Sequence, residues 1–156
     1  MSGTNPGADC PVPPGMAGTT PDPPCRAVGH ACYTVELPAG LVLLNANERP
    51  HWTRQRAITG AIRVAAAALA RAGKVPPLYQ AWITVVLYPH NRRRLDPHNW
   101  GPSAKAAIDG LVDAHVLPDD DHRHLLAVTF MLGPTRPARQ MALHVTATAP
   151  TAPPTQ

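Results

Sequence analysis

The sequence lacks any apolar run of about 18 residues, the length that an α-helix needs to cross a bilayer. Its first residues also lack the basic stretch and following apolar stretch of a secretory signal, so we do not expect them to be one. Cysteine is scarce, and Cys10, Cys25 and Cys32 have no Cys-x-x-Cys spacing. An odd number of cysteines without that spacing argues against a disulfide framework and against a zinc ribbon. We therefore infer a cytoplasmic protein in a reducing environment.

Charged residues are also few, at 15%, whereas hydrophobic residues make up 44% of the 156 residues, enough for one packed domain. Proline is abundant, with 20 residues, of which half lie in residues 1–30 and 149–156. These two segments hold almost no large apolar side chains, so they cannot offset the entropy of an ordered chain. We expect two disordered Pro-rich tails around a domain of residues 31–148.

The net charge is +4, and most of the basic residues are arginine. The planar guanidinium group of arginine can donate two parallel hydrogen bonds to phosphate. A charge of this size is only a weak indication of an anionic partner. The few acidic residues are more informative, because Asp96 and the run Asp119-Asp120-Asp121 form an acidic minority in a basic chain.

Hydrophobic periodicity predicts the first three elements. Residues 33–37 alternate and favour a strand, and residues 81–88 are β-branched and apolar, as in a buried strand. Between them we expect a helix from the cap residue Thr53 to about Ala72, with Gly73 as its stop.

A second helix is expected from about Pro102 to Leu117-Pro118. Residues 125–132 and 139–148 then predict two strands joined as a hairpin. The resulting order β-α-β-α-β-β indicates a small single-domain α/β or α+β fold with a mixed sheet and two main helices.

Side chains suited to chemistry gather within 26 residues around the second helix. If residues 125–132 pair beside residues 81–88, the loops at the two ends of this helix share one site. Carboxylates gathered there need a cation, and Mg²⁺ takes carboxylate and phosphate oxygens. A bound metal can activate water and neutralise charge on a phosphoryl group, and Lys105 would add a positive charge. The residues concerned are Asp96, His98, Asn99, Lys105, Asp109, Asp119, Asp120 and Asp121.

Each feature alone has a plainer interpretation. An aspartate run is usually a solvated turn, and Arg92-Arg93-Arg94 alone would usually be a solvated strand end. Lys105 and Asp109 would form a helix-surface ion pair that adds little stability. The His-x-His spacing of His122 and His124 is more often incidental than metal-binding. Only the combination indicates a function.

That combination resembles the RusA family of Holliday-junction resolvases. The matching segments are Arg92-Arg-Arg-Leu-Asp96-Pro-His98-Asn99 and the stretch from Lys105 through Asp109 to Asp119-Asp120. Members of the family have an Arg-rich strand end, an Asp-x-Asp-Asn motif, a helix with Lys-x-x-x-Asp, and a terminal Asp-Asp pair. The order of elements over residues 33–148 is similar too.

The resemblance implies a homodimer that binds four-way DNA junctions and nicks two strands symmetrically with Mg²⁺ or Mn²⁺. Carried over by position, Asp96 and Asp120 are metal-binding catalytic carboxylates, and Lys105 is a catalytic or phosphate-contacting residue. Beside them, the expected roles are metal binding for Asp119 and His98, DNA contact for Arg92, Arg93, Arg94 and Asn99, and support for Asp109.

The sequence departs from the family pattern at two points. His98 stands where the second aspartate is expected, and three extra residues separate Asn99 from Lys105, which a longer loop would absorb. We expect Pro97 to favour extended geometry and to splay Asp96 from His98. Two alternatives stay open: a junction-binding module with a degenerate metal site, and a dimeric interaction protein, unrelated to DNA, whose Pro-rich tails bind a partner.

Overall fold

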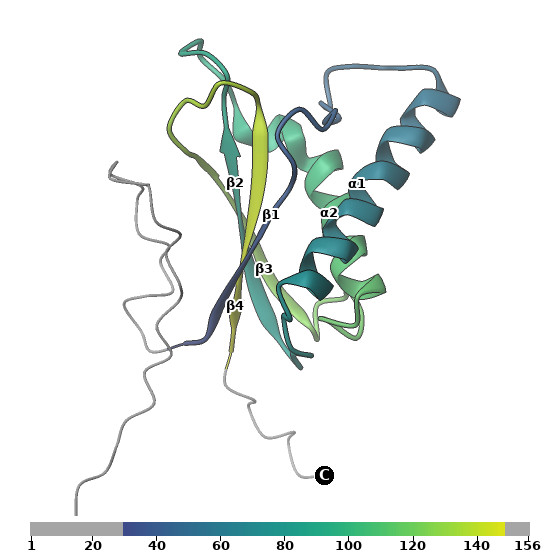
Figure 1. Ribbon diagram of the computed structural model, residues 1–156, viewed down its shortest axis with the longest axis vertical. Helices are drawn as coiled ribbons and strands as arrows, with labels where there is room; N and C mark the ends of the chain where they lie inside the picture. The colour runs from purple at the N-terminus through teal and green to yellow at the C-terminus, as the bar shows by residue number, and fades with distance from the viewer. Residues whose placement is uncertain (1–29, 149–156) are drawn as a thin grey trace, which may run out of the picture.

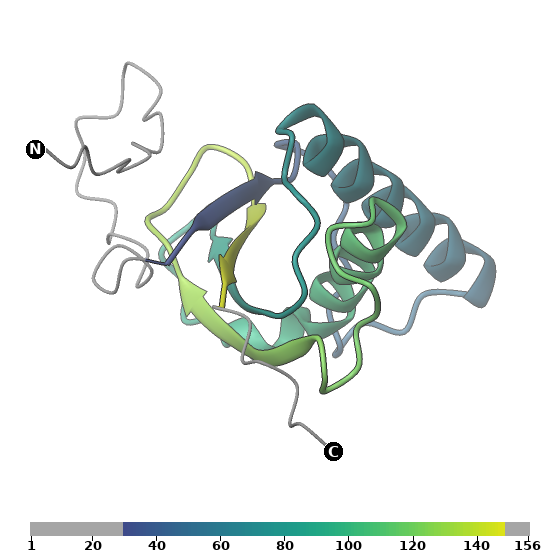
Figure 2. The ribbon, with the colours of Figure 1, turned by 90° about the horizontal axis from the view of Figure 1, so that it is seen from below.

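Four strands and two main helices make up residues 30–148, the part of the chain that this computed structural model describes. Both helices cover the same face of a single sheet (Figures 1 and 2). The predicted small α+β domain is therefore confirmed, whereas the predicted tails lie outside the described residues, except for residue 30. The elements are β1 (Cys32–Glu36), α1 (Trp52–Ala72), β2 (Ala81–Tyr88), the 3₁₀-helix η2 (Pro97–Trp100), α2 (Gly101–Asp113), β3 (Leu125–Leu132) and β4 (Gln140–Ala147).

The sheet has the strand order β1-β4-β2-β3, with β2 and β3 parallel and the other two pairs antiparallel. The predicted pairing of residues 125–132 beside residues 81–88 is confirmed. The predicted hairpin between the last two strands is wrong, because β3 and β4 pair with opposite edges of β2. Residues 133–139 carry the chain past the end of β2, where the Gly133 N–H donates to the Leu87 carbonyl at 2.9 Å. In β2, seven of the eight residues are buried, so this strand needs a neighbour on each side.

The main core lies between the sheet and the helices. Ile83, Val85 and Leu87 of β2 point into it, and all three are buried. On the opposite face, Tyr88 belongs to a smaller buried cluster, and the guanidinium of Arg136 lies 3.5 Å from the centre of its ring. The loop after β3 therefore shields one end of the face that the helices leave open.

The two helices pack closely because small residues lie where they cross. A Cβ atom added to Gly110 of α2 would lie 2.4 Å from the Arg63 carbonyl oxygen of α1 and 2.8 Å from the Ala66 Cβ. Beside this crossing, Arg63 forms an ion pair with Asp113, with Nη2 2.7 Å from Oδ1. The guanidinium holds the pKa of the Asp113 carboxyl below its ordinary value through this hydrogen bond.

The ends of both helices differ from the predicted ones. The first helix is capped by His51 rather than Thr53, since the His51 side chain accepts from the Thr53 N–H. The second ends at Asp113 rather than near Leu117, because His115 adopts a left-handed φ of 59°. Leu117 then turns into the core, where it is 1% exposed.

Cys32 also differs from the expectation. It is disulfide-bonded, although the odd number and the spacing of the cysteines argued against a disulfide framework. Spacing does not reveal pairing, because connectivity cannot be deduced from sequence. Cys10 and Cys25, the other two cysteines, lie outside the described residues. Among residues 30–148, no helix is long and apolar enough to cross a membrane.

Candidate functional site

Lys105 lies on the exposed side of α2, between two carboxylates. Its Nζ donates hydrogen bonds to Asp109, one helical turn further along, and to Asp120 in the loop after α2. The hydrogen bonds to Asp109 and then to Asp120 raise the pKa of Lys105 above its ordinary value. The same contact with Lys105 lowers the pKa of Asp120. Lys105 therefore carries its positive charge, and Asp120 its negative charge, at neutral pH.

The aspartate run has two different roles in the structure. Asp119 Oδ1 accepts a hydrogen bond from the Asp120 N–H at 2.8 Å, which fixes the Asp119-Asp120 pair. Asp121 forms an ion pair with Arg123 instead, in which Asp121 Oδ2 lies 2.7 Å from Arg123 Nη2. The backbone carbonyl of Asp121 accepts a hydrogen bond from the Leu125 N–H. The plain interpretation of a turn-forming aspartate thus holds for Asp121, whereas Asp119 and Asp120 lie at the Lys105 cluster.

Asp96 and His98 are brought together by the 3₁₀-helix η2. Asp96 caps it, and its Oδ1 accepts from the His98 N–H at 3.0 Å and lies 3.2 Å from His98 Nδ1. The expectation that Pro97 would splay the two side chains is wrong, because Pro97 occupies the first position of the turn, where its fixed φ suits a helix. The His98 ring also lies 5.1 Å from the ring of Phe130, which places η2 against β3.

The three extra residues before Lys105 do not lengthen a loop. Trp100 ends η2, and Gly101 and Pro102 form the first turn of α2. Trp100 is 3% exposed, and the guanidinium of Arg139 lies 4.4 Å from the centre of its ring. This buried tryptophan anchors the turn that carries Asp96 and His98.

The remaining predicted residues lie around this turn. Arg92, Arg93 and Arg94 follow β2 on the exposed loop that leads to η2, at the top of Figure 1, and within residues 30–148 they form no ion pair. Asn99 donates its backbone N–H to the Asp96 carbonyl at 3.3 Å. Its own carbonyl accepts from the N–H of Ala46, at 2.7 Å, in the loop before α1.

The predicted site residues thus form two groups, Lys105 with Asp109, Asp119 and Asp120, and Asp96 with His98. Over residues 30–148, no three histidine, cysteine, aspartate or glutamate side chains are arranged to hold a metal ion. The donor set nevertheless fits the chemistry of Mg²⁺ and Mn²⁺, since Mg²⁺ is often bound by only one or two carboxylates and otherwise by water and phosphate oxygens. The imidazole of His98 suits Mn²⁺ better than Mg²⁺.

The loop of residues 41–50 is a neighbour of the site that the sequence did not reveal. It lies between the strand expected at residues 33–37 and the helix expected from Thr53, where the sequence predicts no helix or strand. The hydrogen bond from Ala46 to Asn99 attaches it to η2, and it carries the exposed Arg49, three residues before the exposed Trp52. The unusual content of asparagine, arginine and tryptophan in residues 45–52 was the available signal.

Comparison of the chain with protein-family models and with curated proteins gives no match. The resemblance to the RusA family therefore rests on the motif residues and their spacing.

Proposed function

We propose that this protein is a metal-dependent endodeoxyribonuclease that resolves four-way DNA junctions by paired, symmetric nicks. The observation that supports this most is the contact of Lys105 with Asp120, fifteen residues apart. The pair is formed by two separate parts of the motif that resembles the RusA family. A helix-surface ion pair alone would need only Asp109 as the partner of Lys105.

In this proposal Asp96 and Asp120 hold Mg²⁺ or Mn²⁺, with His98 and Asp119 beside them. The metal, when bound, supplies charge neutralisation at the scissile phosphate and activation of a water molecule. Lys105 stays protonated, because both of its hydrogen bonds raise its pKa. It therefore acts as a fixed positive charge that stabilises the developing phosphoryl charge, and not as a general base.

The exposed residues Arg92, Arg93 and Arg94 contact the phosphates of the bound strand, and Asn99 contacts DNA at the same turn. Such contacts position the backbone without reading its sequence. Two nicks related by two-fold symmetry need two sites related in the same way, which a homodimer supplies.

A junction-binding module without cleavage is the second candidate, and His98 favours it. The imidazole replaces a carboxylate in the motif, and its Nδ1 lies 3.2 Å from Asp96 Oδ1. An interaction protein unrelated to DNA is a third, more distant candidate.

Incubation of the full chain with a synthetic four-way junction and either Mg²⁺ or Mn²⁺ tests the proposal. We expect paired nicks at symmetric positions, and none in the presence of EDTA. Binding without nicks in either metal would favour the binding module instead. Absence of salt-dependent DNA binding would exclude both DNA functions. Light scattering of an active sample checks the dimer, and full activity in a stable monomer would contradict it.

A further inference from the structure

The loop of residues 41–50 is held rigidly against the start of α2. The Ala46 N–H donates to the Asn99 carbonyl at 2.7 Å, and the Leu44 N–H donates to the buried Ser103 Oγ at 2.6 Å. Ser103 Oγ in turn donates to the Leu44 carbonyl at 3.0 Å. The loop therefore has a fixed position relative to η2 and to the candidate site.

Three exposed arginines lie within eight residues of sequence, Arg49 in this loop and Arg54 and Arg56 in the first turns of α1. In the described part of the chain none of the three takes part in an ion pair, whereas Arg63, further along α1, is bound to Asp113. Arg63 thus has a structural role that the other three do not share. Their charges are available to an anion outside the chain.

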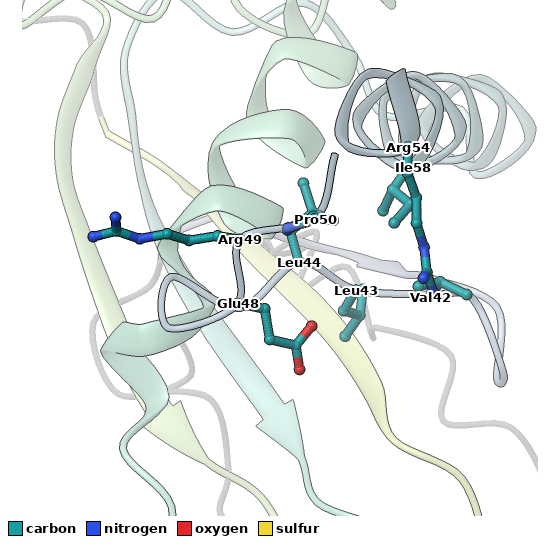
Figure 3. Close-up of a pocket in the computed structure, with 8 residues that line it drawn as sticks. All are labelled: Val42, Leu43, Leu44, Glu48, Arg49, Pro50, Arg54 and Ile58. Atoms are coloured by element: carbon teal, nitrogen blue, oxygen red, sulfur yellow. The ribbon is translucent and has the colours of Figure 1, made fainter. Parts of the chain in front are cut away.

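Two shallow hollows flank the loop. One, of about 310 Å³, lies between the loop and α1, and Arg54 reaches across it towards Val42 (Figure 3). The other, of about 390 Å³, extends to Gln55 of α1 and to Pro102, in the first turn of α2. Arg49 lines both hollows, and in Figure 3 its guanidinium group extends to the side away from Val42. The basic region thus reaches from α1 to the element that carries the candidate site.

Glu48 and Trp52 complete this region. Glu48 is exposed and lines both hollows. The region therefore has three positive charges, from the arginines, and one negative charge. Trp52 is 61% exposed, and its ring lies 5.7 Å from that of His51. Exposed arginines beside an exposed aromatic ring suit a nucleic acid, whose phosphates attract the cations and whose sugars and bases offer flat faces. We call Glu48, Arg49, Trp52, Arg54 and Arg56 the loop–α1 surface.

We infer that the loop–α1 surface binds the sugar–phosphate backbone of a DNA arm as it leaves the candidate site, in addition to the contacts of Arg92–Arg94. The hydrogen bond between Ala46 and Asn99 holds this surface at a fixed position relative to η2, so that one DNA strand can contact both. The inference rests on the proposed function for its substrate, DNA, and not on cleavage.

Binding of the full chain to a fluorescent four-way junction, measured by anisotropy at several salt concentrations, tests the inference. Changing Arg49, Arg54 or Arg56 to Gln removes one phosphate contact at a time. Each lost contact should lower the slope of log affinity against log salt by about 0.9, and the affinity at 0.1 M salt about 8-fold. Glu48→Gln should have the opposite effect and raise the affinity, because it removes a repulsive charge.

Lys74→Gln is the matched control, since Lys74 is an exposed cation just beyond the opposite end of α1. It removes the same charge but should change the affinity less than 2-fold. Thermal unfolding of each variant should match the wild type, because none of the arginines has a partner within residues 30–148.

The outcomes separate the inference from the proposed function. If the wild type nicks junctions and the triple arginine variant keeps its affinity and salt slope, the loop–α1 surface is not a DNA contact. Equal losses in Lys74→Gln and in the arginine variants would show an effect of net charge alone and would also overturn it. If the protein binds through these arginines but never nicks, the surface stands and the nuclease proposal fails. A wild type that binds no DNA overturns both.

Discussion

Lys105 of α2 donates a hydrogen bond to Asp120, which lies fifteen residues further along the chain. The Lys105 side chain is 60% exposed and that of Asp120 29% exposed, so water and salt screen the pair. An ion pair of this kind contributes only about 0–1 kcal/mol to the free energy of unfolding. The contact therefore does little for the stability of the fold, and a separate role for its two charges can be tested without unfolding the protein.

Replacement of Asp120 by Asn should remove nicking activity while it changes the free energy of unfolding by less than about 1 kcal/mol. The reason is that the change removes a negative ligand but keeps the shape of the side chain. Junction affinity should stay equal or rise, because a repulsive charge near the phosphates is lost. Gel assays of nicking and of binding, together with denaturant unfolding, measure the three quantities.

Asp121→Asn is the matched control for this change, since Asp121 is adjacent in sequence but bound to Arg123. We expect it to keep nicking activity and to lose some stability. Full nicking by Asp120→Asn, or equal loss of nicking in both variants, would show that Asp120 has no special part in the reaction.

The choice of metal should depend on His98. Mg²⁺ prefers oxygen ligands, whereas Mn²⁺ accepts imidazole more readily, so wild-type nicking should be faster with Mn²⁺. His98→Asp should restore activity with Mg²⁺, because it returns a carboxylate to that position. Nicking rates of the wild type, His98→Ala and His98→Asp in each metal provide the measurement. An unchanged ratio of Mn²⁺ to Mg²⁺ activity in His98→Ala would mean that the ring does not contact the metal.

Gly110→Ala should destabilise the protein by about 1–3 kcal/mol, the usual effect of overpacking a tight contact. The added Cβ would meet backbone atoms of α1, 2.4 Å from the Arg63 carbonyl oxygen, and these cannot rotate away. Gly60→Ala is the control, because a Cβ at Gly60 in α1 meets nothing within 4 Å. That change should stabilise the helix by about 0.5–1 kcal/mol. Urea unfolding measures both, and equal effects of the two changes would contradict the close crossing.

The free energy of unfolding should fall as the pH drops below about 6.5, in part through His144 of β4. Burial lowers the pKa of His144 from its ordinary value, against the smaller opposing effect of Glu36. The unfolded chain then binds the proton more readily than the folded chain, so stability is greatest above the unfolded pKa and is lost below it. The His144 ring contacts Thr34 Oγ1 at 3.0 Å, across the pair of β1 with β4.

Denaturant unfolding between pH 5 and pH 8 checks this prediction. His144→Gln should flatten the dependence, by at most about 1.4 kcal/mol per pH unit for one proton. His122→Gln, at an exposed histidine, controls for the loss of an imidazole. An identical pH dependence in wild type and His144→Gln would refute the assignment.

Much of the fold could be predicted from sequence because its elements have clear local signals. The buried strand β2 begins and ends where predicted, since a run of β-branched residues is bounded by polar residues and prolines. The partner of each strand had no such signal. A short connection between residues 125–132 and 139–148 favoured a hairpin, but β2 is buried on both faces and takes β3 and β4 as neighbours on opposite edges.

The candidate site also has contacts that local sequence signals predict and contacts that they do not. The spacing of Lys105 and Asp109 predicts their contact directly, because residues four apart face each other on a helix. The proximity of Asp96 and His98 could not be predicted, since it depends on η2, which the burial of Trp100 anchors. No local sequence pattern predicts the ion pair between Arg63 and Asp113, because it forms only when the two helices pack together.

The position of β4 has a consequence for synthesis of the protein. The last strand of the described chain is central in the sheet, between β1 and β2, and β1 pairs with β4. While the ribosome still holds these residues, the nascent chain can form α1, α2 and the pairing of β2 with β3, but β1 has no strand to join. A message truncated shortly before the codons of residues 140–147 would therefore yield a chain with two unpaired strand edges, exposed to aggregation and to proteolysis.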